Sequence, residues 1–271
     1  MIFAKTQSKT RVLGLALGSG GARGFAHVGV LRALREAGLE PDVVAGASAG
    51  AIAATAYASG RLNALEEIAE TLDWRLVAGL FLEFGIPRDG LVKGVRVMRF
   101  LDELIPAERF ESLGVPVAIV AADLEAESEV VFTRGPLHPA IRASIAIPGV
   151  FTPVPHEGRL LADGGLVNPV PVSAARALGA THVIAVDINT QRGGGEPAEP
   201  AGPQKTPSFF NVLTRSFRLY ENAITRLQLL QTPPDLLIAP AVGHIPALDF
   251  THARECVEAG RAAAFAALDA Q

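Results

Sequence analysis

Short apolar runs alternate along the chain with longer segments in which apolar residues recur every three or four positions. Residues 12–17 (VLGLAL) and 42–46 (DVVAG) are runs of the first kind, typical of strands that are buried on both faces. Each is followed by a helical segment, at residues 25–37 and 49–58. This order of strand, helix, strand and helix predicts a parallel sheet with helices on its faces.

The later pattern continues the sheet and makes it mixed. Residues 115–122 (VPVAIVAA) predict another buried strand, and residues 129–132 its hairpin partner. Brief strands are expected at 160–162, 182–187 and 235–240, with short helices at 138–147 and 174–178 and a terminal helix from Thr251, its expected N-cap, to Leu268. The expected fold class is therefore α/β with a mostly parallel central sheet.

Two apolar groups of side chains have more than one interpretation. Within the mostly helical stretch 62–110, one group either packs in the core or covers an acyl-binding cleft: Leu80, Phe81, Leu82, Phe84 and Ile86. The second group forms a stripe on one helix: Phe210, Leu213, Phe217, Tyr220, Ile224 and Leu227. We expect this stripe to be buried in the domain core, with a partner helix or a membrane surface as alternatives.

Residues 190–208 break the pattern. They contain three consecutive glycines and four prolines, a composition that cannot bury apolar surface, so we expect a flexible loop. The 271 residues are otherwise 49% hydrophobic, enough for one large core, and we expect a single domain over residues 1–271.

Charge and cysteine content exclude several classes of protein. A net charge of −4 with scattered lysines and arginines argues against nucleic-acid binding. A single cysteine, Cys256, excludes an intramolecular disulfide framework and a cysteine-based zinc site, and fits a reducing cytoplasm. No stretch reaches the ~18 apolar residues of a spanning helix, so we expect a cytoplasmic protein, with peripheral contact to a membrane left open. We expect no metal and no cofactor, and the oligomeric state is not determined.

The sequence Gly46-Ala47-Ser48-Ala49-Gly50 stands where a predicted strand turns into a predicted helix. Glycines on both sides of Ser48 permit strained backbone angles and a close approach of strand and helix, which would expose the hydroxyl as a nucleophile. The alternative is that Ser48 only caps the following helix.

Two further glycine-rich segments follow strand ends, where ligands bind in an open α/β sheet. In the loop 18–24 the N–H groups of Gly20 to Ala22 can hold an anion, and Arg23 adds positive charge there or is a surface residue. In Asp163-Gly164-Gly165 the carboxylate can act as a base, or the tripeptide is a plain turn. The glycine loop also resembles part of a dinucleotide site, although its spacing is not GxGxxG.

None of the six histidines has a convincing position for a Ser-His-Asp triad. His156 is the one on a loop near Asp163, and three others follow the aspartate in the order of an α/β-hydrolase: His182, His244 and His252. A Ser48-Asp163 dyad is chemically admissible, because burial raises the pKa of a carboxylate and brings it nearer to that of a useful base.

Four blocks of sequence, taken in order, resemble the patatin-like phospholipases. They are the loop 18–24, the Ser48 turn, the segment 143–148 (ASIAIP), and Asp163-Gly164-Gly165. The chain is most similar to the bacterial members related to the esterase domain of neuropathy target esterase, with Ser19 where many relatives have glycine.

The resemblance implies a three-layer α/β/α sandwich with Ser48 as nucleophile and Asp163 as base. It implies Gly20, Gly21 and Arg23 as the residues of the oxyanion loop. Gly46 and Gly50 are then the glycines of the nucleophile elbow around Ser48, and Gly164 and Gly165 those of the aspartate turn. We therefore expect a serine acyl hydrolase that cleaves lipid-like esters. The alternative is a lipid- or partner-binding regulatory protein with the same fold and little turnover.

Overall fold

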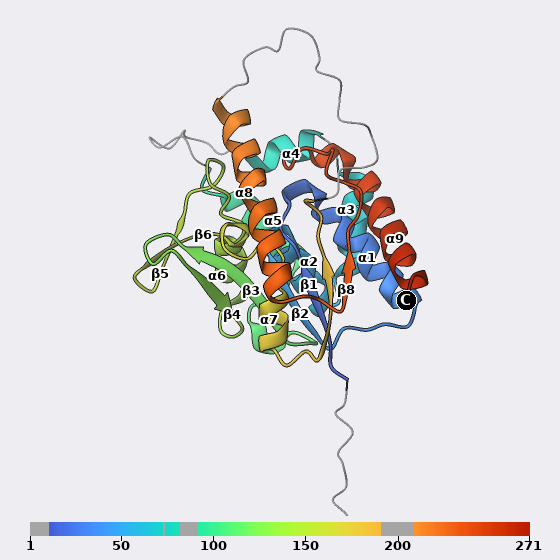
Figure 1. Ribbon diagram of the computed structural model, residues 1–271. Coiled ribbons are helices and arrows are strands. Elements are labelled where there is room, and N and C mark those ends of the chain that lie inside the picture. The colour runs from blue at the N-terminus through green and yellow to red at the C-terminus, as the bar shows by residue number, and fades with distance from the viewer. Residues whose placement is uncertain (1–10, 73, 82–91, 191–208) are drawn as a thin grey trace, which may run out of the picture.

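One mixed sheet forms the centre of the chain (Figure 1). The computed structural model describes residues 11–72, 74–81, 92–190 and 209–271, so residues 191–208, nearly all of the expected flexible loop, lie outside the described residues. Within the described ranges the strands are β1 Leu13–Leu17, β2 Val43–Ala47, β3 Val117–Asp123, β4 Ser128–Phe132, β5 Val154–His156, β6 Arg159–Asp163, β7 His182–Val186 and β8 Leu236–Ile238.

The strand order along the sheet is β5-β6-β3-β2-β1-β7-β8, with β4 paired to β3. The pairs β3–β2, β2–β1, β1–β7 and β7–β8 are parallel. The pairs β3–β4, β3–β6 and β5–β6 are antiparallel, and the first of them is the hairpin expected at 129–132. The prediction of a mixed, mostly parallel sheet is confirmed.

Alternating side chains of the strands face two different helical layers. Leu15 and Leu17 of β1 pack in the larger core cluster, against α1 Phe25–Glu36 and α2 Ala49–Ala58. Ala16, between them, packs in a second cluster with α7 Val172–Ala177. Successive residues of a strand point to opposite faces, so strands buried on both sides produce the continuous apolar runs in the sequence. The expected three-layer α/β/α arrangement is confirmed.

The larger layer contains α1, α2, α3 Leu62–Thr71, α5 Val95–Leu104, α6 Leu137–Ser144 and α9 Ala253–Asp269, with α4 Trp74–Phe81 beside them (Figure 1). The helices α1 and α9 approach closely through glycines: a Cβ on Gly29 would lie 1.9 Å from the Val257 carbonyl oxygen. The expected N-cap of the terminal helix is wrong. Thr251 lies inside the short helix η4 Phe250–His252, whose first turn is capped by the Asp249 carboxylate.

The helix α8 Phe209–Gln231 crosses the opposite face, and its expected burial is wrong (Figure 1). Tyr220 and Leu227 of the predicted apolar stripe are 47% and 58% exposed, whereas Glu221 and Thr225 are buried. Leu213, Phe217 and Ile224 are half-buried, and the Phe210 side chain lies outside the described residues. Hydrogen bonds join the buried side of this helix to the body of the protein, from Ser19 to Glu221 and from Gln228 to the Val167 carbonyl oxygen. The 3.6-residue period of the apolar residues alone does not reveal this rotation.

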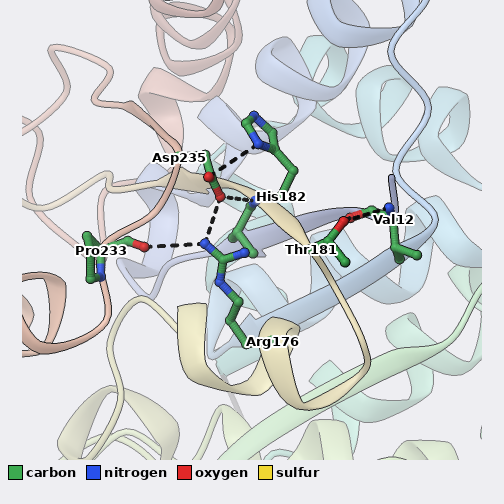
Figure 2. Close-up of polar contacts among 7 residues, drawn as sticks. Val12, Arg176, Thr181, His182, Pro233 and Asp235 are labelled. Atoms are coloured by element: carbon green, nitrogen blue, oxygen red, sulfur yellow. Dashed lines mark hydrogen bonds and ion pairs between the residues drawn. The ribbon is translucent and has the colours of Figure 1, made fainter. Parts of the chain in front are cut away.

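A cluster of polar contacts joins α7 to the start of β7 and the segment before β8 (Figure 2). The Asp235 carboxylate accepts hydrogen bonds at 2.7 Å from both the Val183 N–H and the Arg176 guanidinium. His182 Nδ1 lies 3.3 Å from the same carboxylate. Partial burial would raise the pKa of Asp235, but the hydrogen bonds from Val183 and Arg176 outweigh it and lower the pKa.

Replacing Asp235 by alanine should lower the free energy of unfolding by roughly 1–3 kcal/mol at pH 7, because the Val183 N–H loses its acceptor. Asp235→Asn keeps an acceptor oxygen and should cost less. Since the folded pKa lies below the ordinary 3.8, the charged carboxylate stabilises the fold above that pH and the contribution disappears as the pH falls through the folded value. Urea unfolding at pH 7 and at about pH 3 measures this; a penalty for Asp235→Ala that is the same at both pH values would contradict it.

Candidate active site

Ser48 lies on a sharp turn between β2 and α2. Its backbone has φ 53° and ψ −120°, a conformation that residues other than glycine rarely adopt. The turn needs its two glycines: a Cβ on Gly46 would lie 2.4 Å from the Gly50 carbonyl oxygen, and one on Gly50 would lie 2.0 Å from that of Leu17. The turn therefore has the sharp geometry that a nucleophile elbow requires.

The Ser48 hydroxyl does not cap the helix. It donates a hydrogen bond to Asp163 Oδ2 at 2.6 Å, and the alternative of a simple capping serine is wrong. The Ser48 N–H donates to Ser144 Oγ at 2.9 Å, which holds the turn against α6. Ser144 is buried and was missed as a site residue, although it lies in the segment 143–148 that resembles the family.

The register of β3 explains why residues 48 and 163 meet. One edge of β3 pairs first with β2, which ends with Ala47 opposite Val120, and then with β6, which places Asp163 opposite Ala121. The other edge pairs with β4 from Ile119 to Asp123, across the point where β2 gives way to β6. The strands β2 and β6 therefore meet end to end beside β3, and the residue after Ala47 faces Asp163.

Asp163 is a buried carboxylate with few partners. Its Oδ1 accepts the Gly165 N–H at 2.8 Å, so the Asp163-Gly164-Gly165 segment is more than a plain turn: it leads into η3 Gly164–Leu166 and orients the carboxylate. Burial raises the pKa of Asp163 to about 7, while the bonds from Ser48 and Gly165 oppose this rise. At neutral pH the group can therefore accept and return a proton.

All six histidines lie in described segments, and their hydrogen bonds, ion pairs and ring contacts there are with residues other than Ser48 and Asp163. His27 is buried and its Nε2 donates to the Gly18 carbonyl oxygen at 2.8 Å, and burial lowers its pKa to about 4. His138, His182, His244 and His252 pair with Asp102, Asp235, Glu255 and Asp249, respectively. His156, the one expected near Asp163, packs edge-on against Phe132. A triad through histidine is therefore not assembled among the described residues.

The glycine loop connects β1 to η1 Gly21–Gly24 and α1. The Ala22 N–H donates to the Ala247 carbonyl oxygen at 2.7 Å, so it is not free to hold an anion, contrary to expectation. Gly21 is the first residue of η1, where N–H groups lack a partner within the helix. Gly21 has φ 60° and lines the same cavity as Ser48. Gly20 and Gly21 thus remain the candidate anion donors of the loop.

The buried side chain of Arg23 contacts the backbone of this loop. It is 1% exposed, and its Nε donates to the Gly20 carbonyl oxygen at 3.1 Å, so the alternative of a surface arginine is wrong. Burial lowers the pKa of its guanidinium, although Glu221 favours the charged form. Arg23 therefore holds Gly20 in place and adds positive charge under the loop.

An apolar cavity of about 140 Å³ opens beside Ser48. Among the described residues that line it, Ser48 alone has a polar side chain. The wall is built mainly from α2, α3, α4 and α5, with the residues Ile52, Ala53, Leu65, Ile68, Val77, Leu80, Val97, Phe100, Leu101 and Leu104. Leu80 thus lies on the wall of a cleft, in agreement with the interpretation that the apolar group at 80–86 covers one. The Phe81 side chain and residues 82–91 lie outside the described residues. Cavities lined in this way hold apolar groups.

The dinucleotide alternative would need an acidic residue at the carboxyl end of β2, and Asp42 does not lie there. Asp42 precedes β2, and its carboxylate accepts the Leu13 N–H at 2.7 Å. It therefore lies at the amino ends of the strands, away from the glycine loop at their carboxyl ends, where a ribose would bind.

The family model for patatin-like phospholipase matches residues 15–176, more than half of the chain. The chain belongs to the patatin-like phospholipase family. An uncharacterized NTE family protein of Mycobacterium tuberculosis is 42% identical over 202 residues, covering 74% of this chain and 55% of the relative. Neuropathy target esterase sws of Drosophila melanogaster is 33% identical over 185 residues, 66% of this chain and 13% of the relative. The chain thus spans about half or less of the length of these relatives.

A solved structure, VipD from Legionella pneumophila, has a TM-score of 0.50 to this chain at 14% identity, covering 96% of this chain and 67% of that one. At that identity the likeness supports the fold alone. Membership in the patatin-like phospholipase family is consistent with lipid esterase activity. The match ends at residue 176, so α8 and α9 lie beyond it.

Within this patatin-like elbow, Gly50→Ala should lower the free energy of unfolding by roughly 1–3 kcal/mol or more, because the new methyl group meets the backbone of Leu17 rather than a movable side chain. Gly79→Ala in α4 is the matched control. A Cβ there meets nothing within 4 Å, so the helix should gain stability, by about 0.5–1 kcal/mol. Urea unfolding of both variants tests this; equal stability of the two would show that the turn accepts a side chain at Gly50.

Proposed function

We propose that the chain is a serine carboxylic ester hydrolase that cleaves lipid esters through an acyl-enzyme. The observation that carries the proposal is the 2.6 Å hydrogen bond from Ser48 Oγ to the buried Asp163 carboxylate, at the wall of an apolar cavity. A nucleophile, a base and an acyl-sized apolar space meet at one point. We further propose that residues 1–271 act as one such domain, because a single sheet positions every part of the site.

The proposed reaction has two similar halves. Asp163 takes the Ser48 proton as Oγ attacks the ester carbonyl, and the N–H groups of Gly20 and Gly21 receive the developing oxyanion. The intermediate collapses to an acyl-Ser48 ester, and Asp163 returns its proton to the leaving alcohol. A water molecule then loses a proton to Asp163 and attacks the acyl carbon. The second intermediate collapses with release of the acid, and Asp163 gives the proton to the departing Ser48 Oγ, which restores both the hydroxyl and the carboxylate.

The cavity supports a fatty acyl group as the part of the substrate that is bound. Its wall is apolar from Ile52 on α2 to Phe100 on α5. Binding of an acyl chain becomes more favourable with each methylene group that such a surface removes from water. Phospholipids, lysophospholipids and smaller esters share this acyl group, so all belong to the proposed substrate class.

Ser48→Ala and Asp163→Asn should each lower the hydrolysis of p-nitrophenyl esters by at least about 10³-fold, because one removes the nucleophile and the other the proton acceptor. Asp123→Asn is the matched control: Asp123 is also a buried carboxylate at a strand end that binds backbone N–H groups, and this variant should keep its activity.

Since the pKa of Asp163 is raised to about 7, kcat/KM of the wild type should rise with pH through this value.

A fluorophosphonate probe separates this enzyme from the binding-protein alternative. Stoichiometric labelling at Ser48 of the wild type supports the hydrolase, and unlabelled Ser48 in folded protein supports a regulatory protein with little turnover. Retained turnover in either Ser48→Ala or Asp163→Asn would rule out the dyad.

We also propose that the exposed face of α8 makes a peripheral contact with an anionic lipid surface. Leu219 and Leu230 are 74% and 80% exposed on this face, and Arg215 and Arg226 are exposed beside them. Apolar side chains flanked by arginines are typical of helices that lie on anionic membranes. Among the described residues no helix is both long and apolar enough to cross a membrane.

The double variant Leu219→Ser/Leu230→Ser should bind phosphatidylglycerol-containing vesicles at least tenfold more weakly, since a fully buried leucine contributes about 1.5–3 kcal/mol. Its hydrolysis of a soluble ester should not change. Leu124→Ser, at an exposed leucine in the β3–β4 turn, is the control and should bind like the wild type. Flotation with the vesicles measures the bound fraction, and equal flotation of the double variant and the control would refute the contact.

A further inference from the structure

We propose that Glu221 of α8 is a positioning residue for ester hydrolysis, which acts through Ser19 to hold the glycine loop in the conformation that receives the oxyanion. The proposal rests on the function proposed above. Glu221 lies beyond the residues that match the family model and about 170 residues after the nucleophile, yet it is 4% exposed and lies beside the site.

The first link is a hydrogen bond between α8 and the loop. Ser19 Oγ donates to Glu221 Oε1 at 2.5 Å, and both side chains are buried. The Ser19 N–H donates to the Pro169 carbonyl oxygen at 2.8 Å, and Asn189 Nδ2 approaches Ser19 Oγ at 3.4 Å. Ser19 is therefore held from three directions.

The second link is the peptide bond between Ser19 and Gly20. The Gly20 N–H, a candidate donor to the oxyanion, belongs to the peptide plane that Ser19 begins, so a rotation of the Ser19 backbone turns this N–H. On its other side Gly20 is held by Arg23 Nε. Glu221 and Arg23 thus fix the two ends of the short segment that must present its N–H group to the substrate.

The third link joins Glu221 to the aspartate turn. A Cβ on Gly165 would lie 2.2 Å from Glu221 Oε1, 3.0 Å from Ser19 Oγ and 3.1 Å from Asp163 Oδ1. As these side chains stand, their three oxygens leave no room for a Cβ at residue 165. A single carboxyl group therefore packs against both the oxyanion loop and the turn that carries the base.

The charge environment indicates why this carboxyl group can sit so near Asp163. Burial raises the pKa of Glu221 to about 8; the Ser19 hydrogen bond and Arg23 oppose the rise, and Asp163 and Asp187 add to it. At neutral pH Glu221 is therefore mostly uncharged and places no second full charge beside the base. A glutamine, which is neutral and keeps an acceptor oxygen, should be able to replace it.

The test compares Glu221→Ala, Glu221→Gln, Ser19→Ala and the double variant Ser19→Ala/Glu221→Ala. Loss of one positioned hydrogen bond should lower kcat for p-nitrophenyl butyrate about tenfold in Glu221→Ala and in Ser19→Ala, with KM within about twofold. The double variant should lose no more than either single variant, because both remove one interaction. Glu221→Gln should stay within about threefold of wild type.

Thr225→Val is the matched control. Thr225 is buried one turn further along the same face of α8, and no hydrogen-bond partner of its hydroxyl is found among the described residues, so kcat should not change. Urea unfolding accompanies every variant. Should Glu221→Ala fail to fold, Ser19→Ala and Glu221→Gln still decide the question.

Additive losses in the double variant, a Glu221→Gln enzyme as slow as Glu221→Ala, or unchanged kcat in Ser19→Ala would each overturn the positioning role. Fluorophosphonate labelling of wild-type Ser48 distinguishes a failure of the Glu221 proposal from a failure of the hydrolase proposal. If wild-type Ser48 is not labelled, the hydrolase itself is refuted; if it is labelled at the same rate in all variants, only the role of Glu221 is refuted.

Discussion

The site depends on one feature of the sheet, the edge of β3 that two strands share. The strand β2 leaves this edge at Val120 and β6 takes it over at Ala121 in the opposite direction. Because the two strands meet head-on, the residue that follows β2 and the last residue of β6 must be neighbours. The hydrogen bond between Ser48 and Asp163 is a consequence of this register, and the elbow glycines allow the chain to turn into α2 without leaving it.

Burial gives the carboxyl groups of this site their chemistry. Asp163 is enclosed by β3, β6 and the elbow, so its charged form is poorly solvated and its pKa rises toward neutrality. The few hydrogen bonds it accepts, from Ser48 and Gly165, keep it from becoming a permanently protonated acid. In the proposed mechanism this carboxylate is the proton acceptor near neutral pH, in place of a histidine.

The two sides of α8 are less sharply divided into apolar and polar than those of an ordinary surface helix. Its buried side carries Glu221 and Thr225, and its exposed side carries leucines such as Leu219 and Leu230. A helix that buries polar groups loses part of the hydrophobic free energy that normally holds a helix on a sheet. The contacts that replace it are specific hydrogen bonds, Glu221 to Ser19 and Gln228 to the Val167 carbonyl oxygen, and they tie the helix to the segments that build the site.

Much of this protein was predictable from local sequence. The buried strands, the helices after them and the turn at Ser48 follow from apolar periodicity and from glycine positions, which act over a few residues. The pairing of Ser48 with Asp163 was predictable from the family resemblance, while the burial that raises the pKa of Asp163 required the assembled sheet. The loss of the Ala22 N–H to Ala247 and the burial of Arg23 also depend on segments far apart in the chain.

The rotation of α8 shows where the limit lies. Its amphipathic pattern determined that residues 209–231 form a helix, because backbone hydrogen bonds within a helix depend only on near neighbours. Which side faces the sheet is not contained in that local pattern: on the buried side Glu221 accepts a hydrogen bond from Ser19, about 200 residues away in the chain. Local sequence thus determined the elements and the candidate nucleophile, and tertiary structure alone decided their neighbours, because burial and hydrogen bonding are properties of the assembled chain.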